Sequence, residues 1–324
     1  MKAPGGATGS TRQAPSLSLP PRFFTLIPAD TRIDFVGLSP KMALLSWALI
    51  LLGLVSMVLK GGFNYGIDFT GGTLLDVRFV RPIAIADLRA ALDRPELSSI
   101  SVQDVGGTGA QFQIVAQQGN DETGAVVAAL KSALTQRFGQ GAYEVLRAEN
   151  VGPKVGRDLW REATLAVVAA TIIMGIYIAV RFDLPVGVGA AVKLVHDVLI
   201  TLGAVSLANM EFDLSTVAAL LTVVGFSVND NVIISDRIRE SRRKNRRESL
   251  PALINRSINE TLSRTVINSG TVVLTTTALF VLGGPVIHSF AFALLVGFVI
   301  GTYSSIFVST PIVLYLEARR HRRS

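Results

Sequence analysis

Apolar residues gather in six segments of this 324-residue chain, at about positions 42–59, 163–180, 186–207, 214–235, 265–281 and 289–316. Each segment is close to the ~20 residues that a helix needs to cross the apolar core of a lipid bilayer. One segment comes first, a long gap follows, and the other five come in close succession. The pattern predicts an integral membrane protein, built as an all-α bundle of six transmembrane helices.

The gap, at residues 61–160, is mixed in composition and long enough for one small domain. Leu75, Val77 and Phe79 alternate with Asp76 and Arg78, which is the period of a half-buried strand. The pattern continues as a helix at 85–92, strands at 100–105 and 111–116, a helix at 123–138 and a strand at 143–148. The order βαββαβ predicts an inserted α+β domain of ferredoxin-like type. It holds no histidine or cysteine, which favours a docking module over a catalytic domain.

Lysine and arginine mark one side of the predicted bundle. They occur before the first span, between the second and third, between the fourth and fifth, and at the end of the chain, whereas the connections at 208–213 and 283–288 contain none. Basic residues accumulate in cytoplasmic loops, and long domains are exempt from this rule. Both termini are therefore expected in the cytoplasm, with the domain at 61–160 in the periplasm.

The segments around the spans complete the expected domain plan. Residues 1–22 are rich in glycine, serine, threonine and proline and predict a disordered cytoplasmic tail, followed by an interfacial segment and the first span at 23–60. The other spans occupy 161–318, and 319–324 form a basic cytoplasmic tail. Residues 250–262 carry apolar side chains at helical spacing beneath polar ones, which predicts an amphipathic helix in the cytoplasmic interface.

The formal net charge of +7 comes mainly from the runs that flank the membrane. Topology and anionic headgroups account for such runs, so nucleic-acid binding is not expected. The chain contains no cysteine, which excludes disulfides and cysteine-ligated metal sites. No motif in the sequence predicts a metal or another cofactor.

Asp230 is the most informative residue, because it lies inside the apolar stretch at 221–232. Ionisable groups within membrane-spanning helices are costly and usually serve transport. Asp230 precedes Asp236 at the helix exit by six residues, so it should lie about 9 Å inside the cytoplasmic boundary. Arg264 enters the fifth span at a similar depth. The two residues predict a proton relay, although such a pair can also serve only to fix helix register, or Arg264 can reach headgroups alone.

A second group of ionisable residues lies in the third span. Lys193, His196 and Asp197 share one helical face by their spacing, and Asn229 precedes Asp230 in the fourth span. These four residues form a candidate accessory relay. Neutralisation of Lys193 by Asp197 along one helix is the competing, structural interpretation.

Five separated motifs occur in order along the predicted spans. They are GIDFTGGT at 66–73, HDVLIT at 196–201, GFSVND at 225–230 with DRIRE at 236–240, RT at 264–265 and GTYSSI at 301–306. From about residue 23 to residue 317 the chain resembles the SecF subunits of the SecD/SecF family of bacterial protein-export membrane proteins. The resemblance places the family's transmembrane aspartate at Asp230 and its partner arginine at Arg264. It places structural motif residues at Asp68, Gly71, Gly72, Asp236 and Arg237.

Three positions depart from the family pattern: Lys193 replaces a small or apolar residue, Asn231 a threonine and Phe226 a tyrosine. None of these changes removes a charge from the expected relay. Lys193 adds one, which can compete with Arg264 for Asp230.

The resemblance also implies a function for the whole chain. A multi-pass protein of the bacterial inner membrane would pair with SecD and join the SecYEG channel and the small subunit YajC. It would use the proton gradient to drive the late translocation of unfolded exported polypeptide. In this interpretation Asp230 alternates between a carboxylate paired with Arg264 and a protonated acid, and each state favours a different helix packing.

Three other classes of protein remain as alternatives. A proton antiporter subunit of the resistance-nodulation-division type shares the buried carboxylate but normally has far larger outer domains for its substrate. An intramembrane aspartyl protease needs two carboxylates that share a proton, and Asp197 and Asp230, with Arg264 and Lys193 nearby, do not suit that chemistry. A passive scaffold that only stabilises its partners is the third. No catalytic constellation is present, so an enzyme is not expected.

Overall fold

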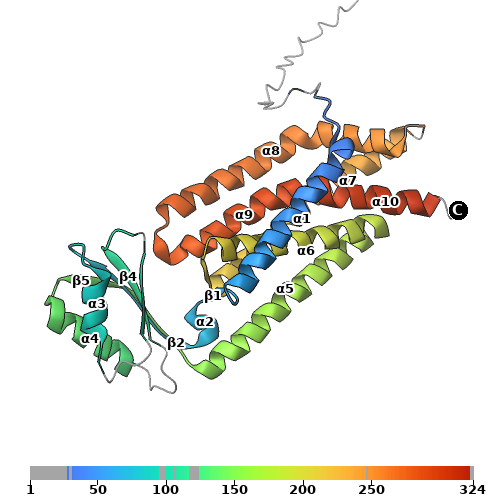
Figure 1. Cartoon of the computed structure of the whole chain (residues 1–324). Helices are drawn as coiled ribbons and strands as arrows, with labels where there is room; N and C mark the ends of the chain where they lie inside the picture. Colours follow the sequence, from blue (N-terminus) through green and yellow to red (C-terminus); the bar gives the residue numbers. More distant parts are fainter. Residues whose placement is uncertain are drawn as a thin grey trace, which may run out of the picture.

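A bundle of long helices stands beside a small sheet domain (Figure 1). The computed structural model describes residue 28 and residues 31–94, 100–105, 107–116, 124–245 and 247–321. The tail expected at 1–22 and the last three residues of the basic tail lie outside the described residues. The described elements are α1 (Phe35–Leu59), β1 (Asn64–Tyr65), α2 (Ile67–Thr70), β2 (Gly72–Phe79), α3 (Ile85–Leu92), β3 (Ile100–Asp104), β4 (Gln111–Ala116), α4 (Ala125–Phe138), β5 (Tyr143–Val151), α5 (Pro153–Arg181), α6 (Leu184–Leu207), β6 (Glu211–Phe212), α7 (Leu214–Lys244), α8 (Leu250–Leu282), η1 (Pro285–Ile287), α9 (His288–Ser304), η2 (Ser305–Ser309) and α10 (Thr310–His321).

Six helical segments in the described part of the chain are long and apolar enough to cross a membrane, which confirms the sequence prediction. Five are α1, α5, α6, α7 and α8, and the sixth runs from α9 into α10. In α6 and α7, 61% and 56% of the most apolar stretch is buried, against 17% in α1, α5 and α8. Helices α6 and α7 therefore form the centre of the bundle. Helices α1, α5 and α8 present apolar side chains outward, as membrane-facing helices do.

Two helices differ in continuity from the separate helices that the sequence predicts. Residues 250–262 are the first part of α8, which runs unbroken to Leu282. Their apolar side chains pack against protein, with Ile254 and Ile258 in one cluster with Phe35 and Ile234.

The last span contains a π-helical turn, η2, between α9 and α10. The hydroxyl of Thr310 donates to the carbonyl of Ser305, five residues earlier, at 3.0 Å. Hydrophobic periodicity does not reveal such a turn, because it changes the hydrogen-bond register and not the apolar character of the helix.

The sheet domain has four strands in the order β3-β4-β2-β5, and every neighbouring pair is antiparallel. The strands and helices follow one another in the order that the sequence predicts. Helices α3 and α4 cover one face of the sheet (Figure 1). Between them lies a core of side chains that alternate along the strands and recur along the helices: Leu75, Val77, Phe79, Leu88, Phe112, Ile114, Leu130 and Leu134.

Short segments join the sheet domain to the bundle. β1 and α2 lead from α1 into β2, and β5 leads directly into α5. β1 also pairs with β6, the connection between α6 and α7, through Asn64 with Glu211 and Tyr65 with Phe212. Five aromatic rings surround this junction: Phe63, Tyr65, Phe69, Trp160 and Phe212. The N-terminus of α7 is thereby held beside the sheet domain.

Candidate functional site

Asp230 lies buried at the centre of the bundle, where three helices meet. Its side chain on α7 is 1% exposed. Oδ2 accepts a hydrogen bond from the hydroxyl of Ser269 on α8 at 3.0 Å and a longer one from Thr302 on α9 at 3.4 Å. Oδ1 has no hydrogen-bond partner among the described residues. One carboxylate thus links three spans while half of its acceptor capacity stays unused.

Other buried polar atoms on α7 and α8 also lack partners. The amide oxygen of Asn231 accepts a bond from Ser309 in the π-helical turn at 2.6 Å, but its amide nitrogen has no partner within the described part of the chain. The same holds for the hydroxyl of Thr265. The amide nitrogen of Asn268 has no hydrogen bond of normal geometry, although its side chain interacts with Asp230. Buried polar groups are nearly always hydrogen-bonded to protein or water, which makes this cluster a candidate functional site.

Lys193 and Asp197 form a second buried centre on α6. Lys193 is 1% exposed and Asp197 is fully buried. The Lys193 ammonium donates to the carbonyl and the hydroxyl of Ser227 on α7, and lies 3.8 Å from Oδ2 of Asp197. Ser227 in turn donates to the same Asp197 oxygen. Lys193 also interacts electrostatically with Asp230, so the two centres are neighbours.

His196 extends this network to two further helices. Its Nδ1 lies 3.0 Å from Oδ1 of Asp197, and its Nε2 lies 2.9 Å from the hydroxyl of Ser46 on α1. Ser46 is 3.0 Å from the hydroxyl of Tyr303 on α9, which donates to the carbonyl of Met42 at 2.6 Å. A continuous chain of hydrogen bonds therefore crosses α7, α6, α1 and α9.

The other expected relay residues lie apart from these centres. Arg264 is exposed on α8, and no ion pair joins it to Asp230 among the described residues. It lines a cavity of about 430 Å³ together with Asp236, Arg237 and Glu260. Asn229 is exposed on α7 and joins neither network in the described structure. The sequence indicated the depth of Arg264 but not the direction in which α8 presents it.

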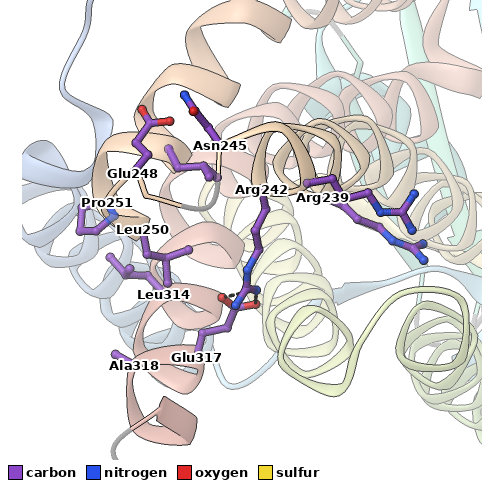
Figure 2. A pocket seen from close by; sticks show the side chains of 11 residues that line it. Arg239, Arg242, Asn245, Glu248, Leu250, Pro251, Leu314, Glu317 and Ala318 are labelled. Atoms are coloured by element: carbon purple, nitrogen blue, oxygen red, sulfur yellow. Dashed lines mark hydrogen bonds and ion pairs between the residues drawn. The ribbon is translucent and has the colours of Figure 1, made fainter.

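Charged residues tie the C-terminal end of α7 to its neighbours. Arg237 pairs with Glu240 and with Glu260 on α8, each at 2.6 Å. One guanidinium nitrogen of Arg242 donates to both oxygens of Glu317 on α10 at 2.9 Å. Figure 2 shows this contact at a cavity of about 750 Å³, with Arg239 pointing away from the pair. These contacts stabilise the helix ends.

The paired glycines of the first motif hold the opposite end of α7. Gly71 and Gly72 have φ angles of +72° and +123°, which only glycine adopts freely. A Cβ atom on Gly71 would lie 2.8 Å from the Cα of Pro153 at the start of α5. Nearby, Oδ2 of Asp68 accepts a bond from the backbone N–H of Leu214, the first residue of α7, at 2.9 Å. The motif thus closes the domain junction and caps the helix that carries Asp230.

Comparisons with known proteins agree with this architecture. The chain matches the family "Protein export membrane protein SecD/SecF, C-terminal" over residues 130–319 and the "SecD/SecF GG Motif" over residues 57–83. The second match contains the glycine pair at the domain junction.

Similar proteins and structures carry related names. "Protein translocase subunit SecF" of Magnetococcus marinus is 44% identical, covering 90% of this chain and 94% of the relative, and that of Vibrio alginolyticus is 38% identical, covering 92% and 94%. The crystal structure of SecDF, a translocon-associated membrane protein from Thermus thermophilus, has a TM-score of 0.79 at 36% identity. It covers 90% of this chain, which spans only 40% of that longer chain. The chain belongs to the SecF subunits of the SecD/SecF protein-export family.

Proposed function

We propose that this chain works as the SecF half of a bacterial SecD/SecF pair at the SecYEG channel, with YajC as a further partner, in the inner membrane. A role in protein export follows from the family, and it is a transport role, not catalysis. The SecDF chain of similar structure is more than twice as long, which leaves room for a separate SecD subunit. The antiporter alternative is not favoured, because the relatives are translocase subunits.

The sheet domain, at about residues 61–160, is proposed to lie in the periplasm as a ferredoxin-like module. The strand order β3-β4-β2-β5, with two helices on one face, supports the fold. The basic residues at the opposite end of the bundle, including Arg237, Arg239 and Arg242, support a cytoplasmic placement of that end. Both termini are then cytoplasmic.

Asp230 is proposed to carry the transported proton. The observation behind this is a buried carboxylate that three helices share and whose Oδ1 has no partner among the described residues. A charged carboxylate needs donors, whereas a protonated one supplies a donor of its own. Proton binding therefore changes the hydrogen bonds that Asp230 makes with Ser269 on α8 and Thr302 on α9. The relative stability of the α7–α8 and α7–α9 contacts changes with them.

Arg264 is proposed to pair with Asp230 in an alternative packing of α8. It lies five residues, or about 7.5 Å of helix, from Ser269, and its guanidinium is exposed at a cavity. Lys193, Asp197 and His196 are proposed to support the relay through their shared hydrogen bonds. The transmembrane potential contributes about 2.3 kcal/mol per charge per 100 mV, enough to bias such a two-state equilibrium.

An export assay in cells tests this proposal. Cells that lack their own SecD/SecF pair would produce this chain with its cognate SecD, and the appearance of a secreted precursor outside would be followed with and without a protonophore. Asp230→Asn should assemble normally but lose the protonophore-sensitive part of export. Asp158→Asn, which removes an exposed carboxylate from α5, is the matched control. Normal gradient-dependent export by Asp230→Asn would refute the proposal.

A further inference from the structure

A row of polar side chains crosses the sheet domain on the face away from α3 and α4. Asp76 on β2 lies directly beside Gln113 on β4 and Arg147 on β5. The sequence pattern places Asp76 on the polar side of a half-buried strand, yet it is only 5% exposed. Oδ1 of Asp76 has no hydrogen-bond partner among the described residues. Asp76 is therefore covered, although Arg78 on the same face of β2 is exposed.

Glu211 of β6 meets this row from the bundle. The side-chain amide of Gln113 donates to Oε2 of Glu211 at 2.9 Å, across 98 residues of sequence. Gly66 lies so close that a Cβ atom there would be 2.8 Å from Oε1 of Glu211. Glu211 comes three residues before the first residue of α7, and Asp213 caps that helix by accepting the N–H of Thr216 at 2.7 Å. The contact thus joins the sheet domain to the helix that carries Asp230.

The charges at this contact do not balance. Three carboxylates, Asp76, Glu149 and Glu211, surround one guanidinium, that of Arg147, which is bonded to Glu149 at 2.7 Å. Asp213 adds a fourth negative charge close to Glu211. Burial raises the pKa of Asp76 to about 6, with the charge of Arg147 acting against this shift and that of Glu149 adding to it. Burial also raises the pKa of Glu211, which the hydrogen bond from Gln113 opposes.

We propose that Asp76 and Glu211 form a proton-binding latch, outside the membrane spans, that holds the sheet domain against the N-terminal end of α7 when a carboxyl is protonated. The site takes a proton as its ligand and is separate from Asp230. When both carboxyls are charged, two buried negative groups face one arginine that already has a partner. The sheet domain is then released from the end of α7.

The direction of the pH dependence follows from the raised pKa of Asp76. A carboxyl whose pKa is higher in the docked state favours docking below its ordinary value of 3.8, and this preference is lost as the pH rises through about 6. If the carboxyl regains its ordinary pKa on release, the docking constant is about tenfold lower at pH 8 than at pH 5. An acidic exterior therefore closes the latch.

A distance measurement on the full chain tests the latch. The sequence has no cysteine, so Lys131→Cys on α4 and Leu282→Cys at the end of α8 can carry spin labels without background. Double electron–electron resonance in lipid nanodiscs measures the distance between the two labels. It should give one narrow distribution at pH 5 and a second, broader population at pH 8. Asp76→Asn copies the neutral carboxyl and should keep the narrow distribution at both pH values.

Two further variants keep the test decisive. Gln113→Ala removes the neutral donor of the contact and should release the domain even at pH 5. Asp87→Asn removes an exposed carboxyl from α3 of the same domain and should behave like the parent chain. The latch is refuted if the parent distribution does not change with pH, or if Asp76→Asn changes in the same way as the parent.

The latch depends on the proposed function in one respect only: the proposed topology determines the side of the membrane from which its proton comes. The distances are measured without a gradient and without an exported polypeptide. A latch that works while Asp230→Asn exports normally would leave this inference standing and remove the proposed relay. Distances that do not respond to pH, together with a loss of export in Asp230→Asn, would refute the latch and leave the proposed relay standing.

Discussion

The buried pair of Lys193 and Asp197 gives a quantitative prediction. The ammonium and the carboxylate are 3.8 Å apart and almost fully buried. Two unit charges at about this distance attract each other by about 4 kcal/mol at an effective dielectric constant of about 20. Asp197→Leu leaves the ammonium without that partner, and removal of one member of a buried pair typically costs about 3–5 kcal/mol. We expect a loss of this size in the free energy of unfolding.

The double variant, Lys193→Met with Asp197→Leu, should recover much of that loss. Replacement of a buried ion pair by apolar residues of similar volume is often close to neutral. Here Ser227 and His196 also lose their bonds to Asp197, which costs about 1–3 kcal/mol for each group that stays unpaired. This cost is shared by Asp197→Leu and the double variant. The double variant should therefore be more stable than Asp197→Leu, with a coupling energy of at least about 2 kcal/mol.

Reversible unfolding in mixed detergent micelles, followed by the fluorescence of Trp47 and Trp160, measures these free energies. Lys131→Met, at an exposed position in the sheet domain, is the control for loss of a lysine and should change the stability by less than about 0.5 kcal/mol. Losses in Lys193→Met and Asp197→Leu that simply add in the double variant would show that the two charges do not interact.

Two other predictions concern topology and helix packing. In a chain with a single cysteine, Asp87→Cys should react with a membrane-impermeant maleimide from the periplasmic side, whereas Asn245→Cys should react only after permeabilisation; the opposite pattern would contradict the proposed orientation. Gly53→Ala should lower the midpoint of thermal unfolding, because its Cβ atom would lie 2.6 Å from the Cα of Gly203 on α6. Gly225→Ala, with nothing within 4 Å, should not lower it, because alanine is the better helix former. Equal midpoints for the two variants would show that the α1–α6 contact tolerates a methyl group.

The spans and Asp230 could be predicted from the sequence because both depend on local patterns. Long apolar runs predict helices in a membrane, and a single aspartate within one is conspicuous. The partners of Asp230 could not be predicted in this way. Ser269 and Thr302 are ordinary residues of apolar helices, and only the rotation of α8 and α9 about their axes brings their hydroxyls to the carboxylate. The same rotation turns Arg264 outward.

The sheet domain shows the same division between local and non-local information. Its strands and helices follow from alternation and helical spacing, since one face of each is buried in the domain core. The burial of Asp76 and its electrostatic interaction with Glu211, 135 residues later in the chain, do not follow from such local patterns. Of the motif residues, Asp68 accepts a hydrogen bond from the backbone at the N-terminus of α7. Residue spacing alone does not reveal this contact.

Proton flux through the reconstituted complex is the most direct test of Asp230 as the proton carrier. Vesicles that contain this chain with SecD and the SecYEG channel, an imposed gradient and a stalled exported polypeptide would report proton entry and polypeptide release together. Asp230→Asn should abolish both while the complex stays assembled, because the amide keeps the size of the side chain but cannot titrate. Proton flux and release at the parent rates in Asp230→Asn would contradict this prediction and make the carboxylate a structural group.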